Sequence, residues 1–293
     1  MAGGDQEAAR QSVRAKIMSL ERGRGNDPSR LLKWSLRLGS FAALALSWEL
    51  LARVANSLLV PTFTETLAAL VRLLMTSRLW GALWISNQAM ALGFGLAAVT
   101  GVAVGFLMGR WRAAERFLEP YLSILLVMPM SAVIPIIIMA TGLGLASRVM
   151  VVFSFAFATI AINTRAGVRM IEPSWIEMTR AFGATERQLW LAILLRGASP
   201  AVLMGLRLGL IRAVSGMITM ELLLIAVGVG RLILHFQGNL EAAEMYAIVI
   251  VVIAEAVLLT QICQRFEVSR FTKYSDRQRY SRAASWADQA VAE

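Results

Sequence analysis

The chain has 293 residues, of which 57% are hydrophobic and 16% are charged, and its formal net charge is +10. Ordinary globular domains contain about 25% charged residues, so this composition argues against a soluble globular protein and favours a chain whose main solvent is lipid. The single cysteine, Cys263, excludes an internal disulfide, and the single histidine, His235, argues against a histidine-based metal centre or catalytic triad.

Six apolar segments have the length of about 20 residues or more that a helix needs to cross the hydrocarbon core of a bilayer. In chain order they cover residues 34–54, 84–108, 118–140, 149–167, 198–227 and 247–266. Pro129 and Pro135 fall inside the third segment, where neighbouring helices can satisfy the backbone groups that a proline leaves unpaired. The sequence therefore predicts an all-α membrane protein with six transmembrane helices, divided into a cytosolic leader (1–33), a transmembrane domain (34–266) and a cytosolic tail (267–293).

Lysine and arginine are distributed unevenly between the two sides of this six-helix arrangement. Most of the 29 lysines and arginines fall in segments that share a side with the N-terminus, whereas a few fall on the opposite side: Arg53, Arg72, Arg78, Arg148 and Arg231. Cytoplasmic segments of membrane proteins carry this excess of positive charge. The distribution predicts that both termini are cytoplasmic, and it accounts for the basicity of the chain without a nucleic-acid partner.

An organised polar loop joins the fourth and fifth predicted helices on the basic side. Trp175, Met178 and Phe182 are spaced by three and four residues, which places them on one face of a short helix. Gly183 suits the end of that helix because glycine accepts a positive φ, and residues 188–195 predict a second helix that leads into the fifth span. The pattern is compatible with a docking site for a soluble protein and also with a helix that lies on lipid.

Charged residues inside predicted membrane helices are costly, so each is expected to face protein or water. Glu221, in the fifth predicted helix, is compatible with a structural hydrogen-bonding role and with a place in a solute pathway. Arg207 and Arg212 lie earlier in the same helix, and we interpret them as side chains that extend toward the inner membrane surface.

Two further patterns concern helix packing and a gate. The second predicted helix carries glycines separated by multiples of four residues, which predict a face for close packing with another helix: Gly93, Gly101, Gly105 and Gly109. The third predicted helix carries methionines near its two prolines, an arrangement compatible with a narrow gate and equally with core packing: Met128, Met130 and Met139.

Several segments of the chain, in order and at matching separations, resemble the permease subunits of ATP-binding-cassette (ABC) importers for nitrate, sulfonates and taurine. They are SWELLARV (47–54), PTFTETLAALVRLL (61–74), GFGLAAVTGVAVGFLMG (93–109), LEPYLSILLVMPMSAVIPIIIMATGLG (118–144), NTRAG (163–167) and GLRLGLIRA (205–213). The polar loop resembles the EAA loop of that family, which carries the cytoplasmic coupling helix between helices 4 and 5. The EAA triplet appears here as Glu177–Met178–Thr179, so only the acid is kept.

The resemblance implies a bacterial cytoplasmic (inner) membrane protein that works with several partners. These are a second permease copy in a homodimer, an ABC ATPase subunit that uses ATP and Mg, a soluble or lipid-anchored solute-binding protein, and membrane lipid. The chain itself is expected to be no enzyme and to bind no cofactor, and no Walker-type phosphate loop occurs in its sequence. The implied coupling residues are Trp175, Glu177, Met178, Arg180, Ala181, Phe182 and Gly183, and the pathway candidates are Met128, Pro129, Met130, Pro135, Asn163 and Glu221.

The predicted function is therefore the solute pathway of an ABC importer for a small anion or polar organic solute such as a sulfonate, taurine or nitrate. Two other functions stay open. A secondary transporter would usually show internal repeats and more polar groups in the middle of its helices. A membrane scaffold would recruit soluble proteins through the polar loop without moving a solute.

Overall fold

The computed structural model describes residues 28–223 and 227–289, and these residues form helices joined by short connections. They fall into two compact units, Met1–Glu65 and Thr66–Glu293. Within the described part, five helices are long and apolar enough to cross a membrane, or six if one bent pair is counted as a single span. The predicted all-α membrane fold is therefore confirmed. Of the predicted leader at 1–33, residues 1–27 lie outside the described residues, and residues 28–33 belong to a helix.

The first unit contains α2 (Pro28–Ala55) and the first residues of α3 (Phe63–Leu74). The chain after α2 turns back, and two side chains near the end of α2 hold this turn. The Trp48 indole N–H donates to the Pro61 carbonyl oxygen at 3.1 Å, and the Glu49 carboxylate accepts from the Thr64 backbone N–H at 3.1 Å. A carboxylate at this position complements the positive end of α3.

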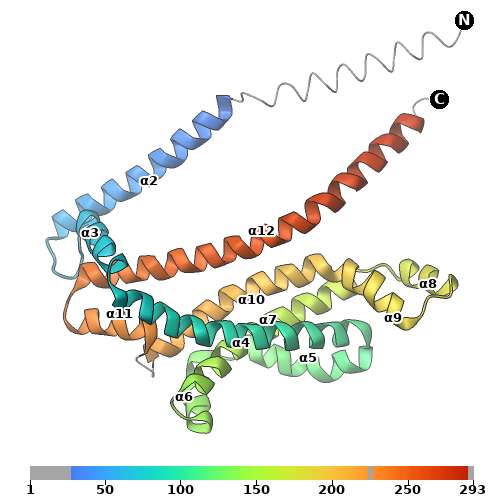
Figure 1. Ribbon diagram of the computed structural model, residues 1–293, viewed down its shortest axis with the longest axis horizontal. Helices are drawn as coiled ribbons and strands as arrows, with labels where there is room; N and C mark the ends of the chain where they lie inside the picture. The colour runs from blue at the N-terminus through green and yellow to red at the C-terminus, as the bar shows by residue number, and fades with distance from the viewer. Residues whose placement is uncertain (1–27, 224–226, 290–293) are drawn as a thin grey trace, which may run out of the picture. The chain divides into compact units, whose positions relative to one another are not determined.

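The second unit is organised around three long helices: α4 (Ser77–Arg110), α7 (Leu145–Arg169) and α10 (Leu195–Leu223). Helix α7 packs along both α4 and α10 (Figure 1). Buried Ile160 of α7 lies between Gly101 of α4 and Gly209 of α10, where a Cβ atom would come within 3.1 Å and 2.5 Å of the isoleucine side chain. These three helices contain most of the second, fourth and fifth predicted spans.

The glycine face predicted in α4 lies against α7. A Cβ atom placed on Gly93 would lie 2.7 Å from the Val149 carbonyl oxygen, and one placed on Gly105 would lie 2.5 Å from the Ala161 carbonyl oxygen. Real side chains do not approach so closely, so only glycine allows the two backbones to meet at these positions. The predicted packing face is confirmed.

Substitution of Gly105 by alanine is expected to lower the thermal unfolding temperature of the detergent-solubilised protein. The added methyl group would overpack the α4–α7 seam, at a cost of about 1–3 kcal/mol. Gly95→Ala is the matched control in the same helix, because no described atom lies within 4 Å of a Cβ placed there. Equal unfolding temperatures for the two variants would contradict the packing.

The third predicted span is not one continuous helix. Helix α5 (Arg112–Val127) and helix α6 (Met130–Thr141) meet at an angle of 106°. The break falls at Met128 and Pro129, both of which have extended backbone conformations. Proline disfavours the helical conformation in the residue before it, so the segment predicted as one span at 118–140 is a broken pair of helices.

Two short helices lie outside the predicted spans: α3 and α11 (Gly228–Gly238). The last helix, α12 (Ala242–Gln289), is longer than the sixth predicted span. Part of α3 packs with α4, α11 and α12 in an apolar cluster that includes Leu73, Leu79, Val229 and Ile248. The sixth predicted span lies in α12, whose backbone continues as a helix beyond residue 266. The start of the predicted tail at 267 is therefore not a helix boundary.

Candidate functional site

The polar loop after α7 contains helix α8 (Pro173–Ala181), whose limits agree with the sequence pattern. Proline stands at its first turn, where a backbone N–H would have no helical partner. Beyond Phe182, Gly183 adopts a φ of +74°, and its backbone N–H donates to the Arg180 carbonyl oxygen at 2.9 Å. The positive φ turns the chain away from the helix and ends it.

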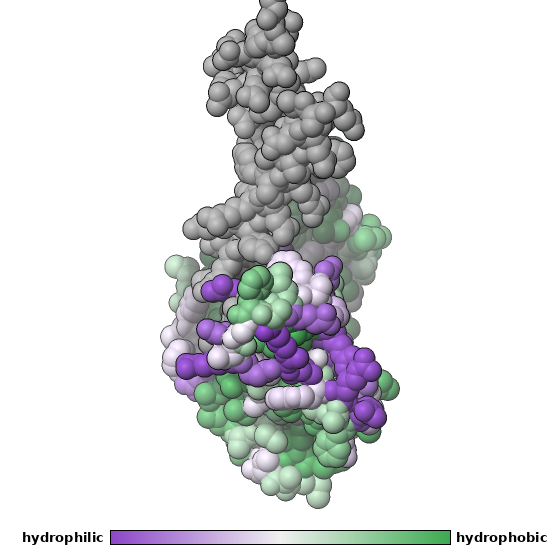
Figure 2. Space-filling view, turned by 90° about the vertical axis from the view of Figure 1, so that its right-hand side faces the viewer, coloured by the Kyte–Doolittle hydropathy of each residue, from purple (hydrophilic) through white to green (hydrophobic). Residues whose placement is uncertain are grey.

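Helix α8 exposes the apolar face predicted from its spacing. Trp175 is 49% exposed, Met178 is 53% exposed and Phe182 is 85% exposed. Ile176 packs instead against the buried cluster that includes Leu194 of the following segment. Figure 2 views this end of the molecule and shows hydrophilic side chains gathered on it beside hydrophobic ones. The helix is thus anchored on one side and presents an uncovered apolar face on another.

Ion pairs connect α8 to the end of α4 through the short helix α9 (Glu186–Gln188). The Glu186 carboxylate lies 2.8 Å from Arg180 of α8 and 3.5 Å from Arg110 of α4. The hydrogen bond from Arg180, assisted by the charges of both arginines, holds the pKa of Glu186 below its ordinary value. The contribution of this bridge is therefore present at neutral pH and is lost as the pH falls through the lowered pKa.

The second helix of the loop, predicted from residue 188, begins at Glu186 and changes to a π-helix after its first turn. Thr185 caps α9, and its backbone N–H donates to the Gln188 side-chain oxygen at 2.8 Å. A π-helix, η1 (Leu189–Leu194), then leads directly into α10. The Trp190 ring lies 5.8 Å from the Trp111 ring, measured between centroids, so the segment after α8 also contacts the chain just beyond α4.

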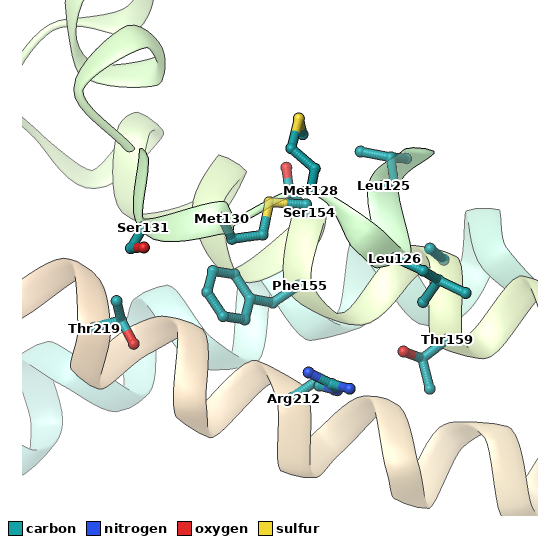
Figure 3. Close-up of a pocket in the computed structure, with 11 residues that line it drawn as sticks. Leu125, Leu126, Met128, Met130, Ser131, Ser154, Phe155, Thr159, Arg212 and Thr219 are labelled. Atoms are coloured by element: carbon teal, nitrogen blue, oxygen red, sulfur yellow. The ribbon is translucent and has the colours of Figure 1, made fainter. Parts of the chain in front are cut away.

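A cavity of about 270 Å³ lies between α5, α6, α7 and α10 (Figure 3). Two of the predicted pathway residues, Met128 and Met130, line it at the α5–α6 break. Phe155 and Thr159 of α7 and Arg212 of α10 also line it. Arg212, which was expected to extend toward the membrane surface, thus lines the cavity, and its position there depends on the bend between α5 and α6.

The other predicted pathway residues lie outside the lining of this cavity. Pro129 forms the N-cap of α6, and Pro135 lies inside α6. The Asn163 side chain donates to the Thr159 backbone carbonyl oxygen at 2.8 Å. Glu221 is fully buried elsewhere in the second unit. The structure therefore brings the two methionines together and separates them from the two polar candidates.

Glu221 joins three helices through its carboxylate. Ser86 of α4 donates to its two oxygens at 2.7 and 2.9 Å, and the Gly230 backbone N–H of α11 donates to Oε2 at 3.0 Å. The Val229 N–H donates in turn to the Ser86 oxygen at 3.0 Å. These contacts agree with the structural hydrogen-bonding role, which was one of the two roles considered for Glu221.

The comparisons with known proteins agree on one family. Residues 97–271 match the family described as binding-protein-dependent transport system inner membrane component. The taurine transport permease TauC of Escherichia coli is 27% identical over 84% of this chain and 94% of its own length. A probable ABC transporter permease of Brucella abortus is 26% identical over 85% of this chain and 99% of its own length.

Two further comparisons cover smaller parts of the chain. The nitrate import permease NrtB of Synechocystis is 30% identical over 50% of this chain and 54% of its own length. A chain from inward-facing MetNI, a methionine ABC transporter, has a TM-score of 0.53 and 22% identity, with coverage of 69% of this chain and 96% of the other. The structural likeness supports the helical membrane fold.

Proposed function

Because the chain belongs to the binding-protein-dependent transport system inner membrane components, the permease subunits of ABC importers, we propose that it carries a small anion or polar organic solute delivered by a binding protein. The observation that carries this proposal is the family match over residues 97–271. That region includes α7, α10, the cavity and the α8 loop. Relatives named for taurine, aliphatic sulfonates and nitrate support the solute class.

In this proposal α8 is the coupling helix, and its exposed face of Trp175, Met178 and Phe182 fills a groove on a separate ATPase subunit that binds ATP and Mg. Aromatic side chains in such desolvated grooves supply much of the energy of an interface. Displacement of α8 would reach α10 through η1, because α8 contacts η1 and its Ile176 packs against the cluster that contains Leu194. It would reach α4 through the Arg180–Glu186–Arg110 bridge.

The proposal also includes the assembly and its orientation. Two copies of the chain pair around the pathway, and two ATPase subunits lie on the side that carries α8. The excess of lysine and arginine in the segments on that side supports a cytoplasmic location for α8 and for both termini. A binding protein then approaches from the opposite side of the membrane.

Phe182→Ala is expected to weaken retention of the ATPase when the two proteins are co-purified at matched permease levels. The loss of one aromatic anchor costs more than about 2 kcal/mol at an interface hot spot, which is roughly thirtyfold in affinity. Phe117→Ala is the matched control, since Phe117 is also exposed but lies in α5 against Tyr121. Retention that is equal in the two variants would favour a helix that lies on lipid.

Uptake measurements separate the three functional classes. The complete importer in proteoliposomes, supplied with its binding protein, is expected to accumulate radiolabelled taurine, an alkanesulfonate or nitrate only when ATP is present. Uptake that continues without ATP would indicate a secondary transporter. A chain that retains soluble partners but moves no solute under any of these conditions would be a scaffold.

A further inference from the structure

Arg212 differs from three other arginines in the helices of the second unit, each of which has a polar partner. Arg148 donates to a backbone carbonyl of α4 at 3.1 Å, and Arg165 pairs with a carboxylate of α5 at 2.8 Å. Arg207 donates to the side-chain oxygen of Gln264 at 2.8 Å in the amide orientation that satisfies both groups. Arg212 forms no hydrogen bond or ion pair with any residue that the structure describes.

The position of Arg212 explains how its charge is accommodated. A guanidinium group within a membrane helix is costly unless it faces protein partners or water. Arg212 is an exposed residue that lines the cavity, and Figure 3 shows its guanidinium group beside the space that Phe155 and Thr159 also face. We therefore expect the cavity to be filled with water or with a counter-ion.

The rest of the lining is suited to an anion. No aspartate or glutamate is among the described residues that line the cavity, so nothing there neutralises Arg212. Ser131 and Thr159 contribute hydroxyl groups. Hydroxyl groups can donate to an anionic oxygen, and the guanidinium fork matches the geometry of a carboxylate or another oxyanion. The two methionines at the α5–α6 break border the same space.

We propose that this cavity is an anion-binding site in the solute pathway, in which Arg212 binds the oxyanion group of the solute, such as a sulfonate, nitrate or carboxylate. The proposal rests on the proposed function and adds the residue that selects the charge of the solute. Arg212 is thus a specificity-determining residue, because a cationic solute would meet a like charge in the cavity.

Two thiol reagents of opposite charge test the site without knowledge of the solute. Cys263, the single cysteine, is first replaced by serine, and Thr159→Cys then places a reporter thiol in the cavity. The full chain in nanodiscs is treated with anionic sulfonatoethyl methanethiosulfonate or with its cationic trimethylammonium analogue. Each rate is divided by the rate of the same reagent with a free thiol. Ser174→Cys, exposed on α8, is the control position.

We expect the anionic reagent to modify Thr159→Cys faster than the cationic one, because a positively charged cleft concentrates anions by about tenfold or more. Arg212→Gln should remove this preference, Arg212→Lys should retain most of it, and the ratio at Ser174→Cys should stay unchanged. If Arg212→Lys keeps the preference for the anionic reagent, the preference depends on the positive charge at this position and not on a loss of folding in Arg212→Gln. An unchanged ratio in Arg212→Gln, or no labelling of Thr159→Cys by either reagent, would overturn the proposal.

The labelling requires neither ATP nor a partner protein, so it can fail independently of the proposed function. If the importer shows ATP-driven anion uptake but Arg212 has no effect on labelling, the proposed function is supported and the proposed anion site is contradicted. If the wild-type importer takes up none of the anionic solutes, the proposed solute class is contradicted.

Discussion

Replacement of Gly183 by proline is expected to abolish ATP-driven solute uptake while the chain still inserts into the membrane. Gly183 has a φ of +74°, whereas proline holds φ near −65°. Proline also removes the N–H that donates to the Arg180 carbonyl oxygen at 2.9 Å. The turn after α8 cannot then form, so Phe182 and the following α9 would be displaced from the surface proposed to receive the ATPase.

Gly183→Asn is the matched control, because asparagine tolerates the left-handed conformation better than other residues with side chains. Uptake into proteoliposomes and ATPase retention are measured for both variants at equal permease levels. We expect the asparagine variant to keep substantial uptake and the proline variant to fall to the level without ATP. Uptake by Gly183→Pro at the wild-type rate would rule out α8 as the coupling helix.

Replacement of Glu221 by alanine is expected to have the largest effect on stability. The carboxylate is fully buried and accepts hydrogen bonds from Ser86 and from the Gly230 backbone N–H. Each buried donor left without an acceptor costs about 1–3 kcal/mol, and the loss falls where α4, α10 and α11 meet. We expect a marked fall in the thermal unfolding temperature and in the yield of monodisperse protein in detergent.

Three variants separate this structural role from a direct role in the pathway. Glu221→Gln keeps one acceptor oxygen and is expected to be less destabilised than the alanine variant. Ser86→Ala combined with Glu221→Ala should cost less than the two changes added together, since the residues share hydrogen bonds. Glu177→Ala removes an exposed carboxylate from α8 and should leave the unfolding temperature unchanged. Wild-type stability of Glu221→Ala with lost uptake would instead place Glu221 in the pathway.

Local patterns in the sequence were sufficient to predict the five continuous membrane helices and α8. Hydropathy over about 20 residues marks a span because every backbone group in lipid must be paired within its own helix. The limits of α8 follow from Pro173 and Gly183, whose effects on φ act within one turn of the chain. The glycine face of α4 was likewise predicted from a spacing within one helix.

The bend at Met128 and Pro129 was not predicted, because a proline inside an apolar segment is compatible with both a continuous and a broken span. Helix α11 is short, and its core position depends on contacts with residues far away in the chain. The break therefore falls inside one predicted span, and α11 lies between the fifth and sixth predicted spans.

The tertiary structure alone decided the surroundings of the charged residues. Ser86 lies 135 positions from Glu221 in the chain, and Arg212 meets the methionines of the α5–α6 break only across a cavity. The cost of a charge inside a membrane helix predicts that each of these two side chains needs a polar partner or water, but it does not identify the partner. That choice depends on how α4, α7 and α10 pack, since side-chain partners distant in sequence become neighbours only when helices associate.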